Sequence, residues 1–347
     1  MKCTQGYKTN SINLIRLIAA ISVMYYHVIA HLDIAGMPAW IESTINYTFG
    51  FVYGVPTFFG ISGFLIWKSI EKSESFTSYA KKRFWRIYPE LWVAVIIEIA
   101  SMLISCPETA EGGYKVAVFG ATQGTIFQFW TPDALRVYGC GTPNGALWTI
   151  GVMIQTYVVM YFLYKFLHGK RAWRWLLVFA ISVCASIVIK NLDGIIPEIP
   201  LKLAGQTFVP FLWLFLAGAF ITEKYDVLIK YLRKLFWIPL ILSFGIMYFG
   251  IDIHTHMYPV FRCLFLIMGL IGFAYAFPRL NIKTDISYGI FLYHMTVVNV
   301  MIQLGYKNDP MYLVIAMVIS VVLAWVSTVT VGRWSAGRKS IKPLAHE

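Results

Sequence analysis

Two polar residues, Arg16 and His27, lie in the first apolar stretch of the chain, which runs from Ser11 to Leu32. On a helix their spacing brings both side chains to within about 20° of one another, about 16 Å apart along the axis. A charge in hydrocarbon is costly, so such residues usually face a bundle interior or a cavity and mark function. An imidazole titrates near neutral pH and can take the proton of a hydroxyl that attacks a thioester. We interpret this face as the wall of a site. The alternative is a structural hydrogen-bond network in which Arg16 extends to the membrane interface.

A basic cluster precedes the third apolar segment, in the run KKRFWRIYP. Arg83 and Arg86 are neighbours on a helix surface, and two guanidinium forks suit bidentate binding of phosphate. We therefore expect them to bind a phosphate-bearing cofactor, with Lys82 and Tyr88 beside them. The alternative is a juxtamembrane cluster that sets the topology and contacts anionic lipid.

Two further stretches place small or polar residues in apolar surroundings. The stretch GVPTFFGISGF contains three glycines and Ser62, which permit close approach of a ligand chain or of a neighbouring helix. The stretch SYGIFLYH begins at Ser287 and puts His294 near the middle of a predicted helix. An intramembrane histidine more often makes a helix–helix hydrogen bond than it performs catalysis. Ser287 and His294 therefore form an additional candidate site, as do Trp148 and Gln155 of the fourth predicted helix.

The elements that must position these residues are membrane helices. The chain is 58% hydrophobic and only 13% charged, with a mean hydropathy of +0.65, which excludes an ordinary soluble domain. A spanning helix needs about 20 largely apolar residues. The sequence predicts an all-α, polytopic membrane protein with a single domain over residues 1–347. Its bundle of about ten transmembrane helices covers residues 10–32, 46–67, 87–106, 146–167, 173–189, 203–222, 235–251, 257–277, 286–304 and 311–332.

The net charge of +12 reflects topology rather than a nucleic-acid surface. With the N-terminus inside, 22 of the 29 Lys and Arg residues fall on the cytoplasmic side. Such an asymmetry obeys the positive-inside rule. It predicts a multi-pass protein of a bacterial-type inner membrane with both termini in the cytoplasm. Five basic residues fall outside, and the other two, Arg16 and Arg262, lie within predicted spans. The five are Lys115, Arg136, Lys190, Lys202 and Lys307.

One long outer-side loop, residues 107–145, interrupts the otherwise short connections. It contains the aromatic run FQFW at residues 127–130. Long structured loops are often functional, so we expect a role toward the acceptor, against the alternative of an amphipathic lid. Cys106 and Cys140 flank this loop and are candidates for a disulfide or for two unpaired small hydrophobic residues. The cysteines and histidines show no metal-binding spacing, and no metal is expected.

Five motifs together resemble the membrane-bound acyltransferase-3 family, and they span residues 11–294. The resemblance implies a ten-helix enzyme that takes acetyl groups from cytoplasmic acetyl-CoA. It would deliver them to hydroxyls of a free or lipid-linked glycan, such as O-antigen or exopolysaccharide. By this resemblance His27 is the catalytic histidine, Arg16 accompanies it, and Arg83 and Arg86 bind the acyl-CoA. The motifs are R-x10-H, GVPxFFxISGF, RxxRIYP, LWTI at residues 147–150 and SYxIxLxH.

The fourth predicted helix departs from the family pattern. Many members carry a glutamate where this chain has Met153. If that carboxylate supports the active histidine in relatives, another group must do so here. Glu90 and Glu98 of the third predicted helix are the nearest alternatives in kind.

Direct transfer and a two-step route through an acylated His27 are both compatible with the residues. Arg16, deeper on the same face, would hold a phosphate or polarise the thioester carbonyl. Two other classes of function remain as alternatives. A transporter or flippase of glycan intermediates would also explain intramembrane polar residues. A structural or sensory protein without catalysis would account for Met153.

Overall fold

The structure, a computed structural model, describes residues 10–128 and 130–338. That part of the chain is all helical, apart from a single β-bridge between His254 and Pro259. The predicted all-α class is therefore confirmed. The predicted cytoplasmic termini and Phe129 of the aromatic run lie outside the described residues.

The described chain divides into two compact units. The first consists of residues 10–23, 38–72 and 148–285, and the second of residues 24–37, 73–147 and 286–338. Helix α2 (Ile12–Leu32) is continuous and contributes to both.

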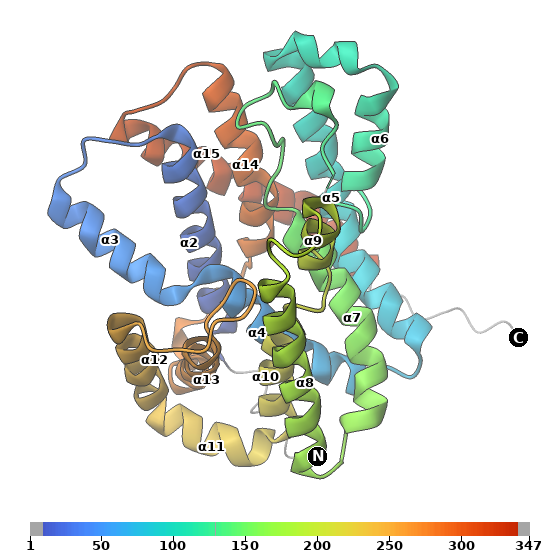
Figure 1. Ribbon diagram of the computed structural model, residues 1–347, viewed down its shortest axis with the longest axis vertical. Helices are drawn as coiled ribbons and strands as arrows, with labels where there is room; N and C mark the ends of the chain where they lie inside the picture. The colour runs from blue at the N-terminus through green and yellow to red at the C-terminus, as the bar shows by residue number, and fades with distance from the viewer. Residues whose placement is uncertain (1–9, 129, 339–347) are drawn as a thin grey trace, which may run out of the picture. The chain divides into compact units, whose positions relative to one another are not determined.

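The first unit holds most of the helices. Within it α13 lies beside both α11 and α12, as Figure 1 shows, and α4 packs mainly on α10. The helices that follow α2 in this unit are α3 (Ala39–Val52), α4 (Gly54–Glu71), α7 (Trp148–Leu167), α8 (Ala172–Asn191), α9 (Glu198–Gly205), α10 (Leu212–Glu223), α11 (Tyr225–Leu235), α12 (Trp237–Phe249), α13 (Val260–Ala276) and the short 3₁₀ turn η3 (Pro278–Leu280).

Glycines allow the close contact between α4 and α10. A Cβ atom on Gly218 would overlap the carbonyl oxygen of Gly60, and one on Gly63 would overlap that of Phe215. Thr222 of α10 also donates a hydrogen bond of 2.6 Å to the carbonyl of Phe64. The glycine-rich stretch noted in the sequence therefore serves helix packing in this unit.

Glu223 ties together the end of α10, the end of α4 and the turn between α7 and α8. Its carboxylate accepts hydrogen bonds from Trp67 Nε1 at 2.9 Å and from the Gly169 N–H at 2.8 Å. The imidazole of His168 lies 2.9 Å away. Because the Glu223 side chain is only 5% exposed, these partners compensate for burying its charge.

The second unit is built around α5 and α14. Ser75 caps the N-terminus of α5, where its hydroxyl accepts the Ser78 N–H, and Asp309 caps α15, which begins with Pro310. Figure 1 shows α14 and α15 side by side, and α14 also packs on α5. The elements of this unit are α5 (Phe76–Ser105), η1 (Pro107–Gly112), α6 (Tyr114–Gln123), η2 (Asp133–Leu135), α14 (Ser287–Gln303), α15 (Pro310–Ser327), the π-helical η4 (Thr328–Gly332) and α16 (Arg333–Arg338).

The long loop is folded rather than extended. Its residues Phe119, Leu135 and Tyr138 bury themselves against the end of α5. Asn299 of α14 accepts the Cys140 N–H at 2.8 Å and donates to carbonyls of the loop. The loop is therefore docked on α5 and α14 within its unit.

The two cysteines that flank the loop are both free thiols. Cys106 is buried in the cluster at the end of α5, and the Sγ of Cys140 lies 3.5 Å from the Thr142 carbonyl. The second of the two sequence alternatives, two unpaired cysteines, is the one observed.

Fewer helices than the ten predicted have the length and composition of a membrane span. Six helices of the described chain are long and apolar enough, or seven if α11 and α12, bent by 70°, form one span. Every predicted segment contains a helix, but a turn at residues 206–211 shortens the segment at 203–222 to α10. The chain has the helices of a membrane protein, and the count of ten is not established.

Candidate functional site

His27 of α2 and His294 of α14 lie against each other in the second unit. The Nδ1 of His27 is 2.8 Å from the Nε2 of His294, and the two rings stack with their planes 9° apart. The Nδ1 of His294 lies 2.9 Å from the carbonyl oxygen of Ile290. His294 is fully buried, whereas His27 is partly accessible.

These contacts assign the protons of both neutral rings. A carbonyl oxygen only accepts, so the Nδ1 of His294 carries the proton and donates it to Ile290. The Nε2 of His294 is then the acceptor, and the Nδ1–H of His27 donates to it. This leaves the Nε2 of His27 as the nitrogen with the lone pair. A histidine held in one tautomer by a second group is the arrangement of a general base in catalytic triads.

The end of α2 is anchored close to this pair. His31 stacks on His27 with ring centroids 6.0 Å apart. The carbonyl of Leu32 accepts the Asn308 N–H at 3.0 Å, and Lys307 pairs with Asp33 at 3.4 Å. The connection between α14 and α15 therefore fixes the helix end that carries the imidazole.

Arg16 forms an ion pair with Asp285 in the first unit. Their side chains are only 18% and 12% exposed, so Asp285 compensates much of the cost of the buried guanidinium. The sequence interpretation did not include Asp285. The feature of the sequence that could have indicated it is the position of this acidic residue, just before the motif that begins at Ser287.

Arg83 and Arg86 lie half-buried on α5 in the second unit, as does Lys82, whose Nζ is 3.2 Å from the Ser73 hydroxyl. All three lie on one helix, because α5 begins at Phe76 and continues beyond Arg86. The sequence placed these three cations before the third apolar segment, and the structure shows that the helix of that segment begins earlier and includes them.

Tyr88 lies in an aromatic stripe of the same helix. Its ring stacks on Phe84 with centroids 4.9 Å apart and lies 5.8 Å from Trp92. These residues recur every four positions, which differs from the i, i+3 relation of Arg83 and Arg86. Around the axis of α5, Tyr88 projects about 140° from Arg83 and about 160° from Arg86, so it lies on another face of the helix than the arginines.

Ser62 contacts the residue that departs from the family pattern. Its hydroxyl lies 3.8 Å from the Sδ of Met153, and the Tyr157 hydroxyl lies 3.9 Å from the same sulfur. Met153 thus packs between two hydroxyls of the first unit. A thioether is a weak acceptor, so these contacts are weaker than those a carboxylate would make.

Glu90 and Glu98 do not take over the role of the missing carboxylate. Glu90 accepts a hydrogen bond of 3.4 Å from Ser327, and Glu98 is buried on α5 with no hydrogen bond to either histidine. The group bonded to Nδ1 of His27 is His294 instead. Sequence reasoning selected both histidines but did not connect them.

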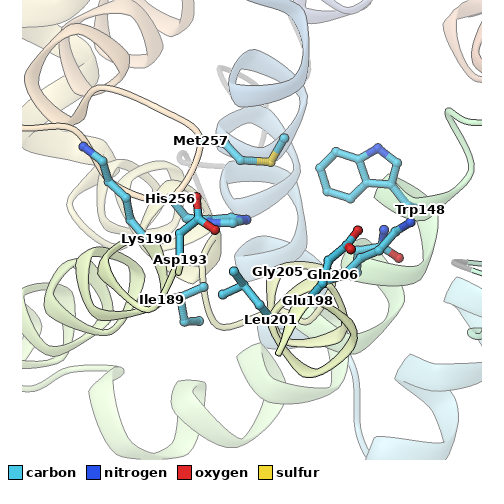
Figure 2. A pocket seen from close by; sticks show the side chains of 11 residues that line it. Trp148, Ile189, Lys190, Asp193, Glu198, Leu201, Gly205, Gln206, His256 and Met257 are labelled. Carbon is cyan, nitrogen blue, oxygen red and sulfur yellow. The ribbon is translucent and has the colours of Figure 1, made fainter. Parts of the chain in front are cut away.

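The remaining candidates lie at the starts of α14 and α7. Ser287 is the buried first residue of α14. Trp148 opens α7 and lines a cavity of the first unit (Figure 2). Gln155, two turns further along α7, accepts the Phe208 N–H at 3.1 Å, and so holds the turn that follows α9. Within the described residues no group of three metal-ligating side chains comes together.

Comparison with known proteins identifies the class. The model of the acyltransferase-3 family, described as an acyltransferase domain, matches residues 9–329. The chain belongs to this acyltransferase family, and the resemblance drawn from the five motifs is confirmed.

Two relatives extend this finding. Nodulation protein 10 of Rhizobium leguminosarum bv. viciae is 28% identical over 92% of this chain and 90% of its own length. An O-acetyl transferase of Shigella phage Sf6 is 30% identical over 44% of this chain and 45% of its own length. No solved structure matches the chain.

Proposed function

We propose that this protein is a single-domain membrane O-acetyltransferase. It moves an acetyl group from cytoplasmic acetyl-CoA to a hydroxyl of a cell-surface or exported glycan, free or lipid-linked. The family supports acyl transfer, and the name of the phage relative supports an oxygen acceptor. The observation that carries the proposal is the chain of hydrogen bonds from Ile290 through His294 to His27.

The chemical step follows from the tautomer of His27, which has its lone pair on Nε2. Its Nε2 takes the proton of the acceptor hydroxyl while the oxygen attacks the thioester carbonyl carbon. The tetrahedral intermediate collapses, the carbon–sulfur bond breaks, and the imidazolium returns the proton to the CoA sulfur. The products are an acetyl ester and CoA, and the Nδ1–H bond to His294 is kept throughout.

The basic residues supply the donor side. Arg83 and Arg86, with Lys82, bind CoA phosphates by charge-assisted hydrogen bonds. Arg16 acts on the donor from the first turns of α2, where Asp285 holds its guanidinium in one orientation. In the predicted topology these cations lie toward the cytoplasm, the compartment that contains acetyl-CoA.

Mass spectrometry of surface glycans from strains with and without the protein tests the function. We expect the strain with the protein to show glycan units heavier by one acetyl group, and the deletion strain to lack them. Identical glycans would contradict the proposal. Transport of glycan intermediates in vesicles without acetyl-CoA would favour the transporter alternative instead.

A further inference from the structure

A cavity of about 480 Å³ opens in the first unit, at a distance in sequence from both histidines. It lies among the end of α8, the helix α9 and the turn at residues 252–258, with Trp148 on the side opposite His256 and Asp193 (Figure 2). This volume falls within the range of small-molecule sites. None of the residues assigned to acetyl-CoA or to the proton transfer lines it.

The residues that line the cavity include an aromatic ring and a glutamine with an unused acceptor. The Trp148 indole rests on Phe211 with ring centroids 5.3 Å apart. The carboxamide oxygen of Gln206 is buried and has no hydrogen-bond partner. A buried acceptor without a donor is costly, so a ligand hydroxyl that met this oxygen after a rotation of the Gln206 side chain would be stabilised.

The walls are held in place by hydrogen bonds outside the cavity. The N–H of His256 lies 3.3 Å from the Ser186 hydroxyl, which donates to the Pro210 carbonyl at 2.9 Å. Gln155 binds the turn that carries Gln206, with its Nε2 3.5 Å from the Gln206 carbonyl. Such fixed walls reduce the entropic cost of binding a ligand.

Gly205 lets the imidazole of His256 approach α9. A Cβ atom at this position would lie 2.7 Å from the Nε2 of His256, which is closer than real Cβ atoms come. Burial lowers the pKa of His256, against the opposing effect of Asp193, and so favours the uncharged ring. An uncharged imidazole both donates and accepts hydrogen bonds, as a sugar hydroxyl does.

The charged residues around the cavity balance in number. Two lysines and two carboxylates line it, so the lining does not select strongly for either sign of charge. The charged residues are Lys190, Lys202, Asp193 and Glu198.

We propose that this cavity binds an uncharged sugar ring of the glycan acceptor, with the apolar face of the ring on Trp148 and its hydroxyls on Gln206, His256 and the carboxylates. The inference rests on the proposed function, because it assumes that the acceptor is a glycan. An aromatic face with a ring of hydrogen-bonding groups suits a pyranose, which has apolar C–H faces and polar edges. Lys190 and Lys202 fall on the outer side in the predicted topology, where such an acceptor is found.

Steady-state kinetics of the full chain in lipid vesicles test this site. The probe is the surface polysaccharide of the source strain after mild alkaline removal of its O-acetyl groups. We expect Trp148→Ala to raise the apparent KM for this polysaccharide about tenfold or more. The KM for acetyl-CoA should stay within about twofold of wild type, because Trp148 is not among the residues assigned to the donor. Trp148→Phe keeps an aromatic face and should retain most of the affinity.

Two other variants keep the test decisive. Gly205→Ala displaces His256 and should raise the same KM, whereas Trp40→Ala, a change at an exposed tryptophan outside the cavity, should not. Wild-type KM values for the polysaccharide in both Trp148→Ala and Gly205→Ala would overturn the proposal and leave the proposed function intact. Absence of transfer to the polysaccharide by the wild-type protein would overturn the proposed function itself, and this inference with it.

Discussion

At the scale of single residues, an uncharged imidazole holds the place beside His27 that a carboxylate holds in many catalytic triads. His294 is buried, and an ionised carboxylate there would lose its hydration. A neutral histidine whose Nδ1–H is already bound to a carbonyl fixes the tautomer of His27 without that cost. The replacement of the family glutamate by Met153 is therefore compatible with an active base.

Variants of His294 test this positioning role. We expect His294→Phe, which retains a ring but no acceptor, to lower kcat for acetyl transfer by about 10²-fold. The KM for acetyl-CoA should not change, because His294 is not assigned to donor binding. His294→Gln offers an acceptor oxygen and should restore part of kcat. Equal activity of the phenylalanine and glutamine variants would contradict the role of the hydrogen bond.

The sequence predicted the site residues singly but not their contacts. His27 and His294 stood out because polar residues are costly within apolar helices. Their hydrogen bond depends on the packing of two helices, and the two histidines are 267 positions apart in the sequence. The Arg16–Asp285 pair was missed for the same reason, since side-chain partners of distant segments have no local signal.

If the basic cluster binds the cofactor, replacing its arginines should lower the affinity for acetyl-CoA. We expect the double variant Arg83→Ala, Arg86→Ala to bind acetyl-CoA about 10- to 100-fold more weakly, because two charge-assisted bonds to phosphate are lost. Isothermal titration calorimetry in detergent measures the affinity. Lys81→Ala, an exposed neighbour in the same run, is the matched control and should bind normally. Unchanged affinity in the double variant would remove these arginines from the donor site.

At the scale of helices, hydrophobic length predicted which segments are helical, and local backbone features set where each helix ends. The segment expected at residues 46–67 is divided between α3 and α4, because Tyr53 adopts a left-handed conformation with φ of 48°. The turn between α9 and α10 similarly interrupts an apolar segment. Apolar composition alone does not reveal such breaks, since the residues on both sides remain hydrophobic.

Because α4 and α10 are in close contact, a larger side chain at a contact glycine should lower the stability of the protein. We expect Gly218→Ala to destabilise the protein by about 1–3 kcal/mol, since the new methyl group overlaps the Gly60 carbonyl. Gly245→Ala on α12 is the control, because nothing lies within 4 Å of the added Cβ. Thermal unfolding in detergent compares the two. A melting temperature of Gly218→Ala equal to that of Gly245→Ala would show that this contact is not tight.

At the scale of the whole molecule, the charge distribution and the number of crossings constrain each other. Both termini lie on one side only if the number of crossings is even. Six spans or the predicted ten satisfy this condition, whereas seven would place the termini on opposite sides. The asymmetry of Lys and Arg therefore predicts an even number of crossings.

Reporter fusions test the predicted topology. We expect a green fluorescent protein fused to the C-terminus to fluoresce, and alkaline phosphatase inserted after Glu111 in the long loop to be active. These reporters work on opposite sides of an inner membrane. Phosphatase activity at the C-terminus would show an odd number of crossings, if the N-terminus is inside, and contradict the charge-based orientation.

Acetyl transfer by a His27→Ala variant is the most direct test of the central claim. The measurement is transfer of radiolabelled acetyl from acetyl-CoA to de-O-acetylated surface polysaccharide by purified protein in vesicles. Because we propose that His27 takes the proton of the attacking hydroxyl, we predict a loss of about 10²- to 10⁴-fold in kcat, with acetyl-CoA affinity unchanged. Transfer by His27→Ala at the wild-type rate would contradict the account.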